Sequence, residues 1–386
     1  MKSYFLLFPI IVLFSTCNKN NTPKPDHSGM FMKFFGGAYN DAGFSVEQTS
    51  DGGFVIVGST ISEGRIDKDV YLVKTDTDGN KVWERKYGGL YDEEGLDIKI
   101  DKAGNFFVAG YVKNKKDSSD CLLLKFDKSG LLLKSFIIGL QAYNEEAKFI
   151  TLDEEKNILI AGTREKSENG QKNMYMVKTN MDSVIWEREL GLHGLYNDIG
   201  TVVETSDHKF LWCGTTSNGN YTDVRICLTD RYSNLYWSYV LGEGDEYSQS
   251  ANEIRATQDD NYIIAGTQKD LKSNISAYLA KVSPTGELLW SKQPGGQGKS
   301  INSVYPLNDG GFVMAGISKE DYLLMKTDQE GNEIWERTYG GNGKDEAKKI
   351  IQTTDSDLLV IGTVFISNNY ALGLLKTNAK GLINKN

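Results

Sequence analysis

The chain has 386 residues, of which 39% are hydrophobic, 40 are glycine and only 6 are proline. Its 43 lysine and arginine residues are outnumbered by 52 aspartate and glutamate residues, so the formal net charge is −9. This acidic balance argues against a nucleic-acid partner, because no basic stripe is present to neutralise phosphates.

The N-terminal 28 residues differ in character from the rest. An apolar run from Tyr4 to Phe14 has the length of a signal-peptide core and is short for a membrane span. Cys17 follows at its end, and residues 18–28 are polar. This order resembles a bacterial lipoprotein signal, which implies removal of residues 1–16, lipidation of Cys17 and a flexible tether over 17–28. The alternative is an ordinary secretory peptide cut nearby. We expect an exported chain, lipid-anchored to the cell envelope at the outer membrane.

A repeated pattern covers the remaining chain. An aromatic or aliphatic residue followed by glycine recurs about every fifty residues, at Gly36, Gly88, Gly139, Gly191, Gly242, Gly295 and Gly340. Each copy then reads as four short strands separated by glycine-rich or polar turns. The period predicts an all-β fold over residues 29–386: a seven-bladed β-propeller of four-stranded antiparallel blades.

The first copy shows the unit most clearly. Its first strand begins at Ser45, the turn 50–53 leads to an apolar second strand ending at Gly58, and the third strand runs to Lys74. A second turn, 76–80, leads to a fourth strand with Trp83. Equivalent tryptophans, which we interpret as packing residues between blades, are Trp186, Trp237, Trp290 and Trp335, whereas the third copy has Lys134 and the N-terminal segment has Phe31.

The two ends of the repeat region complement each other. The last copy stops after its third strand, while residues 30–37 match the fourth strand of the other copies. The sequence therefore predicts that the last blade is completed by an N-terminal strand, which removes the exposed sheet edges.

No metal, cofactor or catalytic set is expected. The turn Asp76-Thr77-Asp78-Gly79-Asn80 resembles part of a calcium loop, but its carboxylates vary between copies while the turn persists. The three histidines, His27, His193 and His208, have no metal-ligand spacing. Cys121, Cys213 and Cys227 are an odd number for an exported protein; a Cys213–Cys227 bridge is conceivable, but we expect buried free thiols.

The connections between fourth and first strands carry the candidate binding residues. Five copies place a tyrosine there beside acidic or polar residues, at one mouth of the expected channel. The candidate set is Tyr39, Asp41, Tyr91, Asp92, Glu93, Tyr143, Glu145, Tyr196, Asp198 and Tyr247. Such residues can stack on and hydrogen-bond a glycan or peptide. The alternative is that each tyrosine packs beneath its loop and each acid caps a backbone group, repeated because the unit was duplicated.

Two segments carry a resemblance to a known group. Residues 75–84 and 326–336, with Asp-Gly-Asn or Glu-Gly-Asn before the tryptophan, look like the tryptophan-docking motif of quinoprotein-like propellers. The whole unit is similar to repeats in uncharacterised exported lipoproteins of Bacteroidetes-like bacteria. The resemblance implies blades and not an activity.

Three functions are compatible with these features. We expect a monomeric, lipid-anchored envelope propeller that binds a protein or glycan without catalysis. The alternatives are an envelope glycan-active enzyme, a lyase or hydrolase with carboxylates at the channel mouth, and a purely structural envelope subunit.

Overall fold

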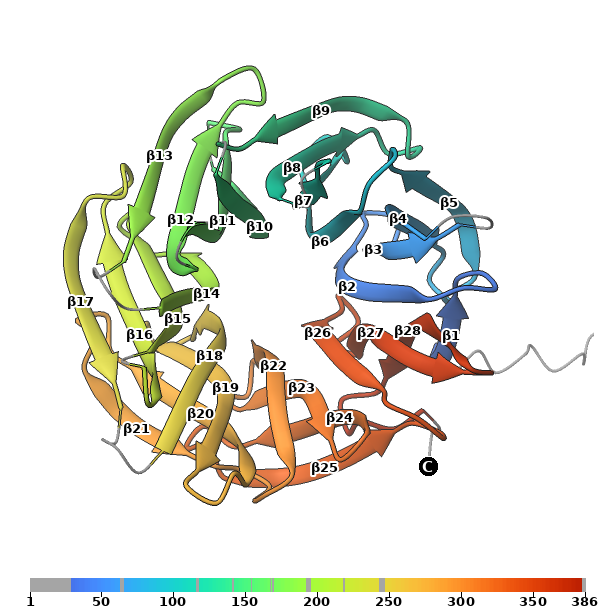
Figure 1. Ribbon diagram of the computed structural model, residues 1–386. Helices are drawn as coiled ribbons and strands as arrows, with labels where there is room; N and C mark the ends of the chain where they lie inside the picture. The colour runs from blue at the N-terminus through green and yellow to red at the C-terminus, as the bar shows by residue number, and fades with distance from the viewer. Residues whose placement is uncertain are drawn as a thin grey trace, which may run out of the picture.

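The computed structural model describes residues 29–383, apart from 63–65, 116–117, 141, 154, 167, 169, 192–195, 218 and 243–246. These residues form seven four-stranded antiparallel sheets, which stand as blades around a central opening (Figure 1). The predicted seven-bladed β-propeller is therefore confirmed. The predicted signal peptide, Cys17 and the tether lie outside the described residues.

Each blade runs from an inner strand beside the central channel to an outer strand at the rim. Blade 1 contains β2 (Asp41–Gln48), β3 (Phe54–Ile61), β4 (Lys68–Thr75) and β5 (Lys81–Tyr87). Blade 2 contains β6 (Glu93–Ile100), β7 (Phe106–Lys113), β8 (Ser119–Phe126) and β9 (Leu132–Ile138). Blade 3 contains β10 (Tyr143–Leu152), β11 (Ile158–Lys166), β12 (Gln171–Thr179) and β13 (Val184–Leu190).

The other four blades repeat this order. Blade 4 contains β14 (Tyr196–Glu204), β15 (Phe210–Ser217), β16 (Thr222–Thr229) and β17 (Leu235–Leu241). Blade 5 contains β18 (Tyr247–Ala256), β19 (Tyr262–Asp270), β20 (Ile275–Val282) and β21 (Leu288–Lys292). Blade 6 contains β22 (Lys299–Pro306), β23 (Phe312–Ser318), β24 (Asp321–Thr327) and β25 (Glu333–Tyr339). Blade 7 contains β26 (Glu346–Gln352), β27 (Leu358–Ile366), β28 (Asn369–Thr377) and the N-terminal strand β1 (Phe31–Phe35).

The hydrophobic core is divided among the interfaces between blades. The two middle strands of each blade are apolar along most of their length because a neighbouring blade covers each of their faces. Between blades 1 and 2, for example, Val57 and Leu72 pack with Phe106 and Leu124, and all four side chains are buried. No single blade could bury these faces alone, so stability depends on stacking around the whole ring.

The second strand of each blade continues past its repeated glycine, as β3 does from Gly58 to Ile61, and does not end there as the sequence predicted. A close backbone approach requires this glycine. A β-bulge in the inner strand presses a carbonyl oxygen onto this glycine. A Cβ atom there would lie between 1.7 and 2.2 Å from that oxygen in all seven blades, 1.7 Å at Gly162 from the oxygen of Glu146. The repeated glycine is therefore a consequence of the bulge.

The tryptophans pack against the neighbouring blade, as predicted. Four of the five indoles, those of Trp83, Trp237, Trp290 and Trp335, lie on a glycine in the turn between the third and fourth strands of the next blade. A Cβ at Gly130 would be 3.0 Å from Trp83, and one at Gly331 would be 2.8 Å from Trp290. These turn glycines have positive φ, 81° at Gly130 and 80° at Gly331, which glycine adopts without strain.

The copy that lacks the tryptophan faces a blade that lacks the turn glycine. Lys134 replaces tryptophan on β9, and the turn of blade 3 that follows has Met181 where most blades have glycine. The Met181 side chain is only 3% exposed and joins the core between blades 2 and 3. Methionine thus fills the space that an indole fills elsewhere.

This exchange predicts a compensating pair. Lys134→Trp alone should lower the free energy of unfolding by about 1–3 kcal/mol, because the indole competes with Met181 for the same space. Adding Met181→Gly should restore part of that loss, which denaturant unfolding of both single variants and the double variant would measure as a coupling energy of about 0.5–3 kcal/mol. Strictly additive effects would contradict the exchange.

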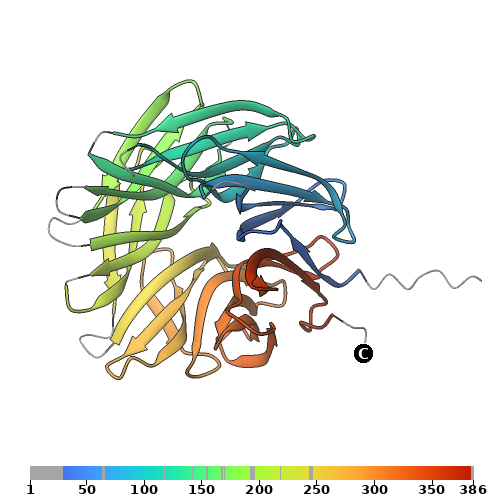
Figure 2. The same cartoon turned by 45° about the vertical axis from the view of Figure 1, so that its right-hand side comes forward.

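The ring closes through β1, as predicted. This strand pairs with β28 in the register Phe31↔Lys376 to Phe35↔Leu372, and Figure 2 shows it beside the red C-terminal strands. Phe31 also contacts blade 1, with its ring centroid 6.4 Å from that of Phe54. The strand therefore joins the last blade to the first.

The three cysteines within the described residues are free and buried. Cys213 pairs across the sheet with Ile226, and Cys227 with Trp212. The two side chains point to opposite faces of blade 4, Cys213 towards blade 5 and Cys227 towards blade 3, so the conceivable bridge is not formed. No helix in the described part of the chain is long and apolar enough to cross a membrane.

Candidate functional site

The antiparallel topology separates two faces of the disc. We call the loop face the side formed by the connections from fourth to first strands and from second to third strands, such as 88–92 and 114–118 in blade 2. The opposite side carries the short turns, such as 101–105, and we call it the turn face. Every candidate residue from the sequence lies at or beside the loop-face end of an inner strand.

Three of the five acidic candidates bind backbone groups of the loop that precedes their own strand. Carboxylate oxygens of Asp41, Glu93 and Glu145 accept hydrogen bonds from the backbone N–H groups of residues 37, 89 and 140, at 2.8, 3.1 and 3.2 Å. Asp345, outside the candidate set, accepts one from Gly341 at 3.1 Å. All four acids are buried. This is the backbone-capping arrangement that the sequence left open as the alternative.

Two further acids link neighbouring segments. An oxygen of Asp92 accepts the backbone N–H of Lys68, in blade 1, at 2.9 Å. Asp198 forms ion pairs with Lys148 at 2.8 Å and Lys172 at 3.6 Å, both in blade 3. Burial alone would raise the pKa of Asp198, but the two lysines outweigh it and lower the pKa. These acids therefore join adjacent blades.

The tyrosines are placed less uniformly. Tyr39 is exposed, whereas Tyr91, Tyr143 and Tyr247 are half-buried. Tyr196 opens β14, and its side chain is not among those that the structure describes. Tyr91 and Tyr143 each line a hollow on the loop face.

Three adjoining hollows lie where blades 2 and 3 meet. The first, about 450 Å³, is lined by Tyr91, Asn114, Lys115, Ser118, Asp120, Gly139, Leu140 and Ala142. The second, about 300 Å³, is lined by Tyr143, Arg164, Lys166, Gln171, Asn173, Glu189 and Gly191. The third, about 420 Å³, runs along the outer strands and is lined by Ile137, Ile138, Gly139, Leu140, Arg164, Val184, Trp186 and Glu187.

Arg164 is common to the second and third hollows and was missed from the sequence. It lies two residues after the glycine of β11, where the other blades have Thr60, Val112, Thr216, Gln268, Ser318 and Val364. In blades 4 and 5 this position hydrogen-bonds the polar residue of the inner strand, as Thr216 does to Asn197 at 2.9 Å. The signal that could have found Arg164 is its departure from an otherwise neutral repeat position.

The Arg164 side chain is 6% exposed and held from several sides. It contacts Glu145 and Glu189 at 3.0 Å and Glu187 at 3.3 Å, and its guanidinium lies 3.9 Å from the ring centre of Tyr175. Burial raises the pKa of Glu145 to about 7, even though Arg164 acts to lower it.

A second polar cluster, also missed from the sequence, lies inside the central channel. Inner-strand side chains accept backbone N–H groups from the next blade: Asp97 from Ile150 at 3.1 Å and Thr201 from Ile254 at 2.8 Å. Glu253 and Ser303 repeat this contact with Val304 and Ile350. The contact joins the inner strands of blades 2 and 3, 4 and 5, 5 and 6, and 6 and 7.

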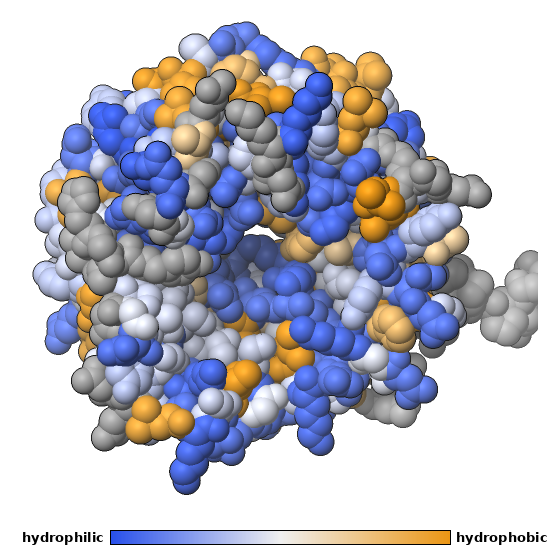
Figure 3. Space-filling view, viewed as in Figure 1, coloured by the Kyte–Doolittle hydropathy of each residue, from blue (hydrophilic) through white to orange (hydrophobic). Residues whose placement is uncertain are grey.

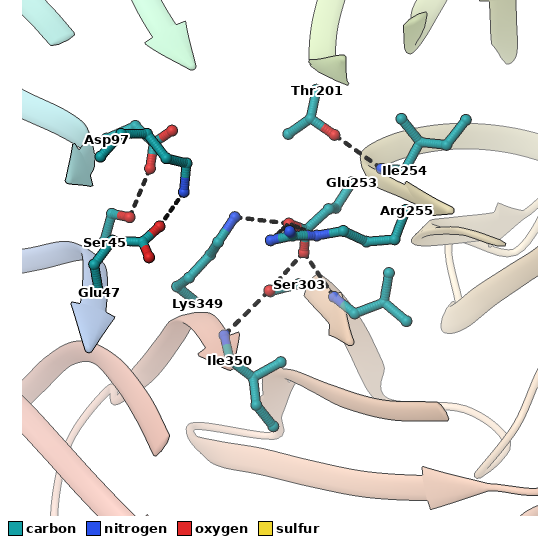
Figure 4. A network of polar contacts seen from close by, with 12 residues as sticks. Ser45, Glu47, Asp97, Thr201, Glu253, Ile254, Arg255, Ser303, Lys349 and Ile350 are labelled. Carbon is teal, nitrogen blue, oxygen red and sulfur yellow. Dashed lines mark hydrogen bonds and ion pairs between the residues drawn. The ribbon is translucent and has the colours of Figure 1, made fainter. Parts of the chain in front are cut away.

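Charged residues of this cluster converge on Glu253 (Figure 4). Lys349 contacts Glu253 at 2.6 Å and Arg255 contacts it at 2.7 Å. Burial alone would raise the pKa of Glu253, but these cations outweigh it and lower the pKa to about 2. Lys99 pairs with Glu47 nearby. In the space-filling view, mostly hydrophilic residues surround the central hollow (Figure 3).

No group of histidine, cysteine, aspartate or glutamate residues in the described part of the chain could hold a metal ion. At the inner-strand ends, Asp41, Glu93 and Glu145 cap backbone groups. In the channel, Glu253 and Glu47 pair with cations. What the loop face of blades 2 and 3 offers is instead a set of shaped hollows with aromatic, amide and charged linings.

Comparison with known proteins identifies the fold. No family model matches the chain, and no curated protein matches it significantly. The WD40 domain of Pan2 from Neurospora crassa superposes with a TM-score of 0.54 at 9% identity, covering 89% of this chain and 91% of that one. Sqt1 from Chaetomium thermophilum gives a TM-score of 0.51 at 11% identity, covering 85% and 82%. A protein of unknown function from Dyadobacter fermentans gives 0.51 at 13% identity, covering 89% and 98%. The likeness is one of fold alone.

Proposed function

We propose that the chain is a non-catalytic binding module of the cell envelope, which holds a protein or glycan partner against its loop face at blades 2 and 3. The observation that carries this proposal is the group of three adjoining hollows, two of them bordered by Tyr91 and Tyr143. A propeller is a rigid disc that presents loops of variable length, and binding commonly resides in such loops. The WD40-like architecture is compatible with this role.

The proposal includes a lipid anchor at Cys17. Its support is the sequence order of apolar run, cysteine and polar tether. A single lipidated cysteine followed by about a dozen polar residues would leave the disc free to turn its loop face towards a partner beside the membrane.

Site-specific photocrosslinking in intact cells tests both parts. A photoreactive amino acid at Lys115, exposed on the loop face of blade 2, should give discrete adducts. The same probe at Lys102 or Lys128, exposed on the turn face of that blade, should not. In detergent phase separation, the Cys17→Ser variant should move from the detergent phase to the aqueous phase. Equal crosslinking from both faces, or none, would overturn the binding proposal, and unchanged partitioning would overturn the anchor.

A further inference from the structure

The hollow of about 300 Å³ on blade 3 has a lining that differs from the other two. Its side chains come from one face of a single sheet, because the register aligns Tyr143 with Lys166 and Lys166 with Gln171. Two residues further along, the register aligns Glu145 with Arg164 and Arg164 with Asn173. Both rows lie on neighbouring strands, so hydrogen bonding between the strands fixes their spacing.

Arg164 lines this hollow and has more N–H donors than its carboxylate partners use. A guanidinium has five N–H groups, and three of them donate to Glu145, Glu189 and Glu187. Those carboxylates and the Tyr175 ring hold the group in one orientation. One N–H group remains on each terminal nitrogen, and Arg164 lines the hollow, so we expect these groups to donate to a ligand there. The site is therefore preorganised.

The chemistry of the lining selects among ligand classes. It combines one aromatic ring, Tyr143, with the side-chain amides of Gln171 and Asn173, the carboxylate of Glu189 and the ammonium of Lys166, and it contains no aliphatic side chain. An apolar peptide anchor would find no complementary surface there. A strongly charged ligand would meet charges of both signs, because Arg164 and Lys166 are accompanied by three glutamates.

We propose that this hollow binds a neutral sugar unit of a glycan. A sugar presents hydroxyl groups that both donate and accept hydrogen bonds, together with a ring face of C–H groups that can lie on an aromatic side chain. The volume is at the lower end of the range for ligand pockets, about 300–1,000 Å³, which suits one or two sugar rings. The inference rests on the proposed function and names its ligand class.

The 450 Å³ hollow gives a longer glycan room to continue. It begins at Leu140 and Ala142, immediately before Tyr143 in the chain, and adds Tyr91, Asn114 and Ser118. A second aromatic ring flanked by an amide and a hydroxyl repeats the chemistry of the first hollow. Oligosaccharides should therefore bind more tightly than single sugars.

Titration with defined sugars tests the inference. The neutral probes are four tetrasaccharides: cellotetraose, maltotetraose, mannotetraose and chitotetraose. Tetragalacturonate is the charged comparison. Calorimetry and saturation-transfer NMR measure binding of each probe. At least one neutral tetrasaccharide should bind, and tetragalacturonate should not. Gln171→Ala and Tyr143→Ala should each weaken binding about tenfold, equivalent to about 1.4 kcal/mol per contact.

The control is Gln258→Ala, an exposed glutamine on the turn face of blade 5, which should leave binding unchanged. Thermal unfolding verifies that every variant is folded. Failure of all neutral probes, preference for tetragalacturonate, or binding unaffected by Gln171→Ala and Tyr143→Ala would overturn the sugar site. If loop-face crosslinks are still found in cells, the sugar inference alone falls; if they are absent too, the proposed function falls with it.

Discussion

Deleting residues 29–36 should lower the free energy of unfolding by several kcal/mol, because it removes β1 and opens the ring. The strand makes its backbone pairs with β28 and buries Phe31 and Phe35, which are 8% and 9% exposed. Phe31 also covers the turn glycine of blade 1, where a Cβ at Gly79 would be 2.5 Å from its ring. Deletion therefore exposes an edge of blade 7 and a face of blade 1 together.

Point substitutions separate the packing from the loss of the strand. Phe31→Ala should cost about 3–5 kcal/mol, as large-to-small changes of buried phenylalanine do. Phe34→Ala on the same strand is the matched control, since Phe34 is 49% exposed, and it should cost less than about 1 kcal/mol. Denaturant unfolding measures all three variants, and a deletion as stable as the parent would contradict closure by β1.

Gly162→Ala should be among the most destabilising single substitutions in the chain, with an expected loss of about 3 kcal/mol or more. The added Cβ would lie 1.7 Å from the carbonyl oxygen of Glu146, so the inner strand of blade 3 would have to move. That displacement would disturb the bulge in β10 and the contacts of the inner strand with its neighbours. Thermal and denaturant unfolding would measure the loss.

Gly341→Ala is the control for this prediction. A Cβ at Gly341 has no atom within 4 Å, and its φ is not in the positive region, so the change should stay within about 0.5 kcal/mol. Equal effects at the two glycines would show that the carbonyl approach is not what requires glycine at position 162.

The sequence by itself determined the architecture, because in a repeat protein the same local pattern recurs several times along the chain. Seven anchor glycines predicted seven blades, and the unpaired segment 30–37 predicted the closing strand. The tryptophans also predicted contacts between blades, since a large aromatic side chain at one repeated position must be covered by the next unit. These features depend on contacts that are local or recur at a fixed spacing.

The sequence also predicted which end of the inner strands would carry aromatic and acidic residues, but not how they are used. Whether Glu93 points to solvent or back to the N–H of Gly89 depends on the path of one loop, and both outcomes fit the same residues. The hydrogen bond of 3.1 Å between them is a property of the folded loop alone. Sequence reasoning therefore left binding and capping open.

Only the tertiary structure brought Arg164 to Glu145, Glu187 and Glu189, and Glu253 to Lys349, 96 residues away. Each of these residues occurs in one blade only. A repeat pattern predicts the features that the seven blades share, and it does not predict a contact that occurs in a single blade. Their partners come from different strands or blades, so register and ring closure decide which charges meet. The periodicity of the sequence predicts the blades. The hollows and charge pairs depend instead on where the folded ring positions the residues, such as Arg164 and Glu253, that depart from the repeat.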